Sequence, residues 1–231
     1  AIILFVIREK PITNLEQASN SIESHLEYRI PLTTRLKMVL KNSQTWIVGL
    51  YALFVFAPIP AFAALWGVPF LIAVYHLSPT VAGSSCAMIW LGMGVGSLFA
   101  GWISEKMGSR NKPLVLSAAL GIFATIAILY LHLSFNWLIV FLFLFGVGTS
   151  GQALSFNVVN DNVSSKVAGT AMGFNNLMIV ISGALFQPLV GWILRNNWDG
   201  KMLAGAPVYS EHAYRLGLFM LPLCYFVAMF I

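Results

Sequence analysis

Six long apolar segments, separated by short polar linkers, account for most of the chain. A helix needs about 20 mostly apolar residues to cross the hydrocarbon core of a membrane, and each segment meets that length. A shorter apolar stretch at residues 1–7 comes before them and ends abruptly in Arg8-Glu9-Lys10-Pro11, as the end of a preceding membrane helix would. The pattern predicts an all-α membrane protein with spans at residues 44–75, 79–103, 113–133, 136–159, 168–194 and 212–231.

The composition supports a membrane protein and argues against a soluble one. Hydrophobic residues make up 58% of the chain, charged residues only 9%, and the mean hydropathy is +0.81. Soluble domains carry about 25% charged residues. The net charge of +5 does not indicate nucleic-acid binding, because the basic residues form no patch with interleaved aromatic residues. Cys86 and Cys224 lie inside apolar runs and are expected to be small buried hydrophobic residues.

The basic residues are distributed unevenly between the two sides of the membrane that the six spans define. Cytoplasmic loops of membrane proteins carry an excess of Lys and Arg. One side holds only Arg195, Lys201 and Arg215, so the other side is expected to be cytoplasmic, with loops 8–43, 104–112 and 160–167. That side holds ten of the thirteen basic residues, namely Arg8, Lys10, Arg29, Arg35, Lys37, Lys41, Lys106, Arg110, Lys112 and Lys166.

The long polar stretch at residues 8–43 is expected to be a linker that ends in a surface helix. Four apolar residues at its end follow a helical period, and three basic residues lie off that stripe. This pattern is typical of an amphipathic helix on the membrane surface, although a cytoplasmic extension of the first span would also explain it. The apolar positions are Leu32, Leu36, Val39 and Leu40, and the basic ones are Arg35, Lys37 and Lys41.

Three prolines, Pro58, Pro60 and Pro69, interrupt the first span. Each removes a backbone donor and is expected to kink the helix. Broken helices are tolerated in membranes only where protein or water covers the freed polar groups. The first span is therefore a candidate to line a cavity, although a passive kink would leave the same pattern.

The linker after the second span carries the most informative motif, Gly101-Trp102-Ile103-Ser104-Glu105-Lys106-Met107-Gly108-Ser109-Arg110-Asn111-Lys112. A glycine there permits close helix approach, and an acidic side chain at a helix N-terminus gains typically 0.3–1 kcal/mol. Lys106 and Arg110 can pair with Glu105 or bind lipid headgroups. Such a charged cluster suits a latch that holds one of two conformations, although a simple positively charged turn would also fit.

This linker resembles the loop motif that joins the second and third helices of each half in the major facilitator superfamily. Residues 77–83 and 167–173 resemble the beginnings of that family's eighth and eleventh helices. Two positions depart from the motif, because Glu105 replaces the more common Asp and Ser109 replaces an Arg. The second change weakens any charge relay in the loop.

The resemblance covers essentially the whole chain and implies helices seven to twelve of a twelve-helix transporter. Residues 1–7 would then end the sixth helix, 8–43 would be the linker, and 44–231 would be the C-terminal six-helix bundle, built from two inverted repeats. We therefore expect a fragment or ordered part of a longer protein. Its missing partner would be an N-terminal six-helix half, and the gating motif would be Gly101, Glu105, Lys106, Gly108 and Arg110.

A few polar residues inside the spans are candidates to contact substrate. In the family, the first and fourth helices of each half line the cavity. The resemblance therefore favours Tyr51, Thr149 and Gln152, with Trp66 as an aromatic wall, and Asn176 in the fifth span is a further candidate. Because a buried polar group needs a partner, each of them is equally explained by an interhelical hydrogen bond.

Two glycine-rich patterns are explained by their position inside membrane spans and do not indicate catalysis or cofactor binding. Gly146-Val147-Gly148-Thr149-Ser150-Gly151 matches a dinucleotide-binding fingerprint and, in part, the serine motif of rhomboid proteases. It lies inside a span, and the histidines His76, His132 and His212 are predicted at the far ends of helices. Gly92 and Gly96 form a small-xxx-small pair that permits close helix packing. The sequence predicts no enzyme, no catalytic residue, no metal site and no cofactor.

No Asp, Glu, Lys or Arg lies near the middle of any span, and such charges usually mark ion coupling. If transport is driven by protons, the titrating residue is expected in the other half. The predicted function is alternating-access transport of a small polar or organic solute, as symporter or uniporter, in a bacterial inner membrane. A channel-like pore and a non-transporting receptor or assembly module remain as alternatives.

Overall fold

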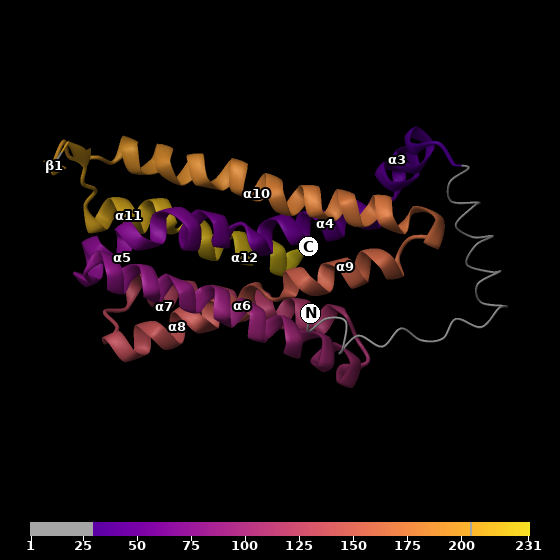
Figure 1. Ribbon diagram of the computed structural model, residues 1–231, viewed down its shortest axis with the longest axis horizontal. Coiled ribbons are helices and arrows are strands. Elements are labelled where there is room, and N and C mark those ends of the chain that lie inside the picture. Colours follow the sequence, from indigo (N-terminus) through magenta and orange to yellow (C-terminus); the bar gives the residue numbers. More distant parts are fainter. Residues whose placement is uncertain (1–29, 204) are drawn as a thin grey trace, which may run out of the picture.

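The computed structural model describes residues 30–203 and 205–231. The predicted helix end at 1–7 and most of the linker at 8–43 lie outside the described residues. The described part contains six helices that are long and apolar enough to cross a membrane, as predicted (Figure 1). They are Ser43–Tyr75, Pro79–Met107, Asn111–Tyr130, Phe135–Asp161, Ser165–Asn196 and Glu211–Phe230.

Three of the spans are built from more than one helical element. The first comprises α4 (Ser43–Phe56), the π-helix η1 (Ile59–Trp66) and α5 (Gly67–Tyr75); the fourth comprises α8 (Phe135–Thr149) and α9 (Gly151–Asp161); the sixth comprises α11 (Glu211–Leu218) and α12 (Met220–Phe230). The others are α6 (Pro79–Met107), α7 (Asn111–Tyr130) and α10 (Ala168–Asn196), the last preceded by the 3-10 turn η2 (Ser165–Val167). A two-stranded hairpin, β1 (Met202–Leu203) with β2 (Ala206–Pro207), precedes α11.

The first span breaks where two of its prolines fall. Pro58 and Pro60 lack the N–H groups that an α-helical ladder needs, and the chain between α4 and α5 winds as a π-helix. Pro69 was predicted to kink the span as well, but it lies in the first turn of α5 without interrupting it. α5 follows η1 directly, and the helix continues past this proline to Tyr75.

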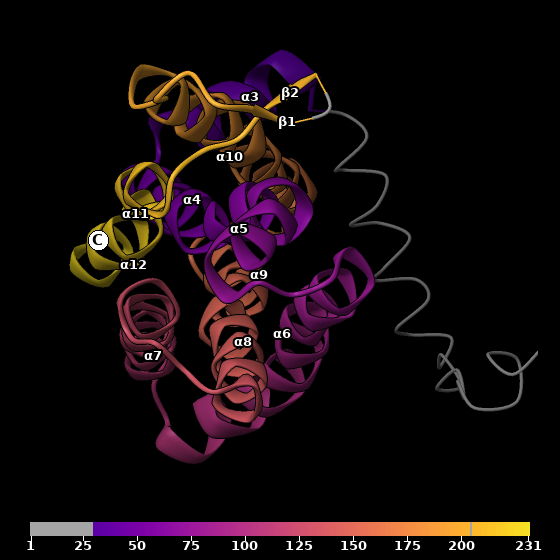
Figure 2. The ribbon, with the colours of Figure 1, turned by 90° about the vertical axis from the view of Figure 1, so that its left-hand side faces the viewer.

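Two central helices organise the bundle. Figure 2 shows α8 between α6 and α7, and α4 between α10 and α12. At the crossing of α6 and α8, a Cβ on Gly92 would overlap the carbonyl oxygen of Phe143, and one on Gly146 would overlap that of Ile89. A Cβ on Gly96 would lie 2.8 Å from the Ser150 Cβ atom. The close packing predicted for Gly92 and Gly96 is therefore confirmed.

The glycines of the fingerprint-like pattern are packing positions. Gly146 faces α6, a Cβ on Gly148 would lie 2.5 Å from the Gly121 nitrogen on α7, and one on Gly151 would overlap the hydroxyls of Tyr51 and Ser117. Each glycine of the pattern thus lets a different helix approach the central span. The Ser150 hydroxyl donates to the Val147 carbonyl at 2.6 Å.

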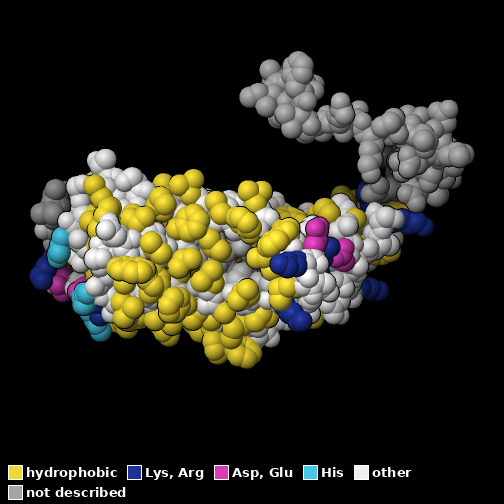
Figure 3. Space-filling model, turned by 90° about the horizontal axis from the view of Figure 1, so that it is seen from below, with side chains coloured by type: hydrophobic (Ala, Val, Ile, Leu, Met, Phe, Trp, Pro, Cys, Tyr) yellow, Lys and Arg dark blue, Asp and Glu magenta, His cyan; other side chains and the backbone are white. Residues whose placement is uncertain are grey.

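The two ends of the bundle differ in charge. We call the end formed by residues 30–42, 104–112 and 160–167 the basic end, and the other the opposite end. Figure 3 shows one face of the molecule with a broad hydrophobic surface, Lys and Arg side chains gathered toward the basic end and His side chains at the opposite end. Large apolar side chains on this membrane-spanning part are exposed, Leu98 by 78% and Trp137 by 60%. Contact with lipid explains such exposure.

A helix, α3 (Leu32–Lys41), forms at the basic end, at the position predicted for the surface helix (Figure 1). Val39 is buried against a small apolar cluster that includes Val48, Val159 and Ala171. Leu32, Leu36 and Leu40 are exposed, so the predicted stripe is only partly covered by the bundle. Contact of the exposed part with a membrane surface stays a prediction.

Candidate functional site

A pair of hydrogen bonds joins the broken part of the first span to α10. The Gln187 side-chain amide donates to the carbonyl of Pro60 at 2.9 Å, and the Trp66 indole N–H donates to the carbonyl of Gln187 at 3.2 Å. Gly183 and Gly191 on α10 leave room for the Pro60 and Trp66 rings. A break in a membrane helix persists only where neighbouring groups cover its polar backbone, and α10 supplies one such donor here.

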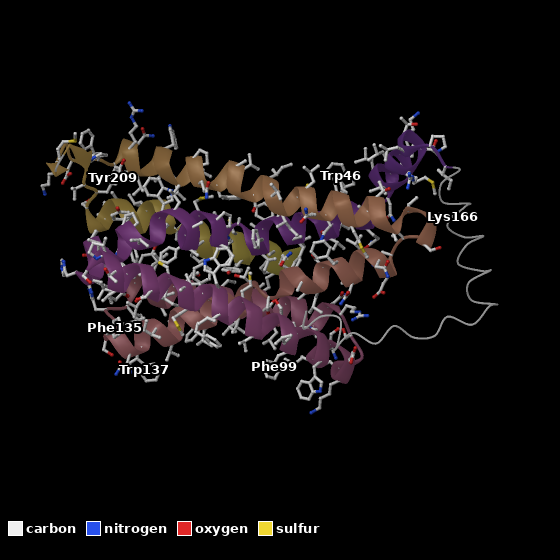
Figure 4. All side chains as sticks on the ribbon, viewed as in Figure 1. Trp46, Phe99, Phe135, Trp137, Lys166 and Tyr209 are labelled. Carbon is white, nitrogen blue, oxygen red and sulfur yellow. The ribbon has the colours of Figure 1, made fainter. Side chains whose placement is uncertain are left out.

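Trp66 also connects this break to the opposite end. Its ring centroid lies 6.3 Å from that of Tyr209, and Tyr209 lies 5.9 Å from Tyr214 on α11. Figure 4 labels Tyr209 at this end of the bundle, beside α10 and α11. Further edge-to-face contacts run from Tyr214 to Phe70 and on to Phe62. Pairs of this geometry stabilise a fold by about 0.5–1.5 kcal/mol each, in addition to the effect of buried area. The segment after the break is therefore held in place by one aromatic cluster.

Thr149 and Tyr51, two predicted substrate contacts, are engaged inside the bundle. The Thr149 hydroxyl donates to the Phe145 carbonyl at 3.2 Å and accepts from the Tyr225 hydroxyl at 2.6 Å. The Tyr51 hydroxyl lies 3.1 Å from both the Leu114 carbonyl oxygen and the Ser117 hydroxyl. Tyr51 also borders a cavity of about 570 Å³ at the basic end, whose polar lining comes from Gln44, Asn111 and Asn162. A role of either residue in substrate binding stays a prediction.

Gln152 and Asn176 have a different environment. Gln152 is half-buried in α9, and Asn176 is exposed on α10, next to the fully buried Asn175. Successive helix residues point about 100° apart. Asn175 therefore turns inward and donates to the Ser155 hydroxyl at 2.9 Å, while Asn176 turns away from the bundle. Within the described residues no side-chain hydrogen bond is found for Gln152 or Asn176.

Sequence reasoning missed Asn157, which is also exposed, on α9. The signal was available, because an amide inside a predicted apolar span is costly unless it has a polar neighbour. It also missed Tyr225 and Ser117, the partners of Thr149 and Tyr51. Nothing in a linear pattern says which helix will lie beside which, so those partners required the fold.

The loop at the basic end is shaped by Gly108. Its φ of 56° lies in the left-handed region, and its N–H and that of Ser109 bond back to the carbonyls of Glu105 and Ser104. Such a cap favours glycine, which explains why α6 runs to Met107, beyond the predicted end of the span at residue 103.

The charges of the loop are not arranged as expected. Arg110 does not pair with Glu105; its Nε atom lies 3.1 Å from the Asp161 carboxylate, at the end of α9. The turn at Gly108 ends α6 and starts α7 beside α9, which brings Arg110 to Asp161. Lys106 lies 5.1 Å from the centre of the Trp102 ring. The exposed Glu105 has no ion pair within the described part of the chain.

Five glycines lie on open faces of α6 and α10. A Cβ added to any of them would meet no atom within 4 Å. Gly101 was expected to mark a close helix approach, but no helix of the described chain approaches it, because it lies on the outer side of α6. The five are Gly83, Gly94 and Gly101 on α6, and Gly169 and Gly173 on α10.

The geometry defines a multi-pass membrane protein with one six-helix bundle, interrupted first, fourth and sixth spans, and open glycine-bearing faces. Residues 1–188 match the family model of the Major Facilitator Superfamily, and the chain belongs to this superfamily. The resemblance drawn from the loop at residues 101–112 is thus confirmed, and so are the all-α six-span fold and its membrane location.

Two curated proteins illustrate the similarity. The probable hexose phosphate transport protein of Chlamydia pneumoniae is 28% identical over 163 residues, which are 68% of this chain and 35% of that protein. The membrane sensor protein UhpC of Escherichia coli (strain K12) is 27% identical over 173 residues, 71% of this chain and 38% of that protein. The chain therefore spans little more than a third of the length of these relatives.

Among solved structures, the inward-open xylose transporter XylE from Escherichia coli superimposes with a TM-score of 0.65 at 16% sequence identity. The match covers 81% of this chain and 46% of that one. At this identity the likeness shows the fold alone. The chain has the architecture of about half of such a protein.

Proposed function

We propose that this chain is the C-terminal half of a secondary transporter that moves a small polar organic solute by alternating access. The observation that carries the proposal is a pair of amide side chains within apolar helices, one exposed and one half-buried. Gln152 and Asn176 lack partners inside the described bundle, and a lipid-facing amide would cost several kcal/mol. A water-filled pathway or the other half of the protein satisfies them, and substrate hydrogen bonds can replace that water.

The open faces of α6 and α10 support a second half as partner. Small residues let transmembrane helices approach closely, and those at Gly94, Gly101 and Gly173 have no neighbour in this half. We propose that an N-terminal six-helix bundle packs there and rocks against this one. The basic end would face the cytoplasm, in a bacterial inner membrane, as the Lys and Arg bias and the bacterial relatives suggest.

The hexose phosphate relative makes phosphorylated sugars the first substrate class to test. No Lys or Arg lies near the middle of a span in this chain, so a phosphate group would be bound by cations of the other half. This half would supply neutral contacts, Gln152, Asn176 and the Trp66 ring. No Asp or Glu lies near the middle of a span either, so any coupling proton would also be bound in the other half.

The amide contacts are tested by uptake into vesicles containing the full-length protein. Gln152→Leu and Asn176→Leu should each raise the KM for a radiolabelled hexose phosphate about five- to tenfold, the loss of one net hydrogen bond. Asn196→Leu, at the end of the same helix as Asn176, should leave KM unchanged. Equal effects of Asn176→Leu and Asn196→Leu on KM would reject these contacts. An unchanged KM in both Gln152→Leu and Asn176→Leu would reject them too.

The latch is tested at Glu105, because the family's gating role for this loop implies that the residue acts on a partner outside this half. Glu105 lies near the C-terminal end of α6, so the latch requires it to meet a helix N-terminus of the other half. Glu105→Ala should then lower the uptake rate by up to about fivefold while KM changes little. Asp161→Asn is the comparison, since it breaks the Arg110 pair within the half and leaves Glu105 in place. Unchanged rates for Glu105→Ala in reconstituted vesicles would count against the latch.

The match to a membrane sensor protein, at nearly the same identity as the transporter match, favours a second candidate. A sensor on this fold would bind its solute and show no flux. Thermal stabilisation by a hexose phosphate without uptake in vesicles would support the sensor and overturn the transporter. Uptake above that of protein-free vesicles would do the reverse.

A further inference from the structure

An apolar groove runs along the outside of the bundle, between α6 and α7 and over α8. Its volume is about 360 Å³, and its rims come from Val95 and Phe99 on α6 and Leu116 on α7. Phe99 and Leu116 are 56% and 58% exposed. Figure 4 shows Phe99 projecting from α6 at the edge of the bundle. The groove is therefore open along a membrane-spanning surface.

The floor of the groove offers no free polar group. Its two hydroxyls both donate to carbonyls of their own helices, Ser117 to Leu114 at 2.8 Å and Ser150 to Val147 at 2.6 Å. Gly96 makes the groove deeper, because it leaves the space beside Ser150 without a side chain. A ligand that fits such a lining is a hydrocarbon chain, since any polar group in it would lose its partners.

The groove ends beneath a basic loop. Ile103 and Pro113, the last lining residues on α6 and α7, flank residues 104–112. The loop holds Lys106, Arg110 and Lys112 against the one carboxylate of Glu105. Arg110 is held by Asp161, while the two lysines have no ion pair within the part of the chain that the structure describes. Trp102, under the Lys106 ammonium, is a residue typical of the headgroup level.

The groove and the glycine-bearing face lie on different sides of α6. At 100° per residue, Gly94 and Gly101 point about 140–160° away from Phe99. A second half packed on the glycines therefore leaves the groove open to the bilayer. Figure 3 shows a broad hydrophobic surface on one face of the molecule, with Lys and Arg side chains gathered at its basic end.

From this arrangement we propose a binding site for one anionic phospholipid. An acyl chain lies in the groove between α6 and α7, and the phosphate headgroup lies against Lys106 and Lys112. Buried apolar chain and electrostatic attraction together give the affinity. The proposal does not depend on what the protein transports.

The test uses the full-length protein in mixed micelles with phosphatidylglycerol that carries a photoreactive diazirine in one acyl chain. Phosphatidylcholine with the same labelled chain is the headgroup control. In the wild-type protein, labelled peptides should be concentrated at residues 95–103 and 113–120, and phosphatidylglycerol should label them more strongly. Labelling spread evenly over the lipid-facing helices, absent from the groove, or equal for the two lipids would overturn the proposal.

Two matched pairs of variants separate the chain from the headgroup. Val95→Trp fills the groove and should lower labelling there about tenfold, as expected when roughly two methylenes are displaced. Val140→Trp, a similarly exposed valine on α8 outside the groove, should not. Lys112→Gln should weaken phosphatidylglycerol binding about fivefold, and Lys166→Gln, elsewhere at the basic end, should not.

Each variant is checked by thermal unfolding before labelling. If Val95→Trp does not fold, Leu116→Trp on the opposite rim replaces it with the same expected loss. Equal labelling of Val95→Trp and Val140→Trp would overturn the acyl-chain site. Equal weakening of phosphatidylglycerol binding by Lys112→Gln and Lys166→Gln would show that only general surface charge attracts the headgroup. That result would overturn the headgroup contact.

Discussion

Replacing Gly92 by leucine is expected to destabilise the bundle by about 3 kcal/mol or more, at or above the upper end of the usual overpacking range. Even a Cβ at this position would overlap the carbonyl oxygen of Phe143 on α8. The obstacle is backbone, which cannot move aside as a flexible side chain would. Thermal unfolding of the purified full-length protein in detergent measures the effect.

Gly94, two residues away on the same helix, is the matched control. A Cβ there meets nothing within 4 Å, so Gly94→Leu should leave the melting temperature of the bundle nearly unchanged. If the face of Gly94 packs against a second half, this variant should slow uptake without unfolding the protein. A Gly92→Leu variant as stable as the wild-type protein would show that the crossing of α6 and α8 is not as tight as described.

The second large effect is expected at the hydrogen bond between Thr149 and Tyr225. Both groups are buried, and the bond is 2.6 Å long. Thr149→Val or Tyr225→Phe alone should each cost about 1–3 kcal/mol, because one hydroxyl is left without its partner. The double variant should cost clearly less than the sum, and thermal unfolding of all four proteins measures this coupling.

This cycle also tests the predicted substrate contact at Thr149. A purely structural hydroxyl predicts that Thr149→Val and Tyr225→Phe have similar effects on uptake. A direct contact with substrate predicts a raised KM for Thr149→Val only. Strict additivity of the two losses in stability would mean that the hydrogen bond contributes nothing to folding.

The number and type of the spans could be predicted because membrane insertion is a local property of sequence. Lipid accepts no unpaired backbone polar group, so an apolar run of about 20 residues is almost obliged to be helical. The interruption near Pro58 and Pro60 could be predicted for the same reason, because a missing N–H removes a hydrogen bond from any helix. The break at Ser150 was not predicted, because no proline marks it.

The partners of the candidate residues could not be predicted in the same way. Thr149 and Tyr225 are 76 residues apart, and Gln187 and Pro60 are 127 apart. Only the packing of α12 on α7, where Tyr225 reaches past Gly121, and of α10 on η1 brings these groups together. The same reason explains Arg110, whose local neighbour Glu105 was the natural partner in sequence and whose partner in space is Asp161.

The sequence by itself determined that this protein is a six-span helical membrane bundle with one strongly basic end, and the motif around Glu105 indicated its superfamily. Tertiary structure alone decided which polar groups are consumed inside the bundle and which face outward. It also distinguished glycines at close helix crossings, such as Gly92, from glycines on open faces, such as Gly94. The physical reason is that hydropathy and helix-breaking act on neighbours in the chain, while hydrogen bonds and packing act between helices that only the fold brings together.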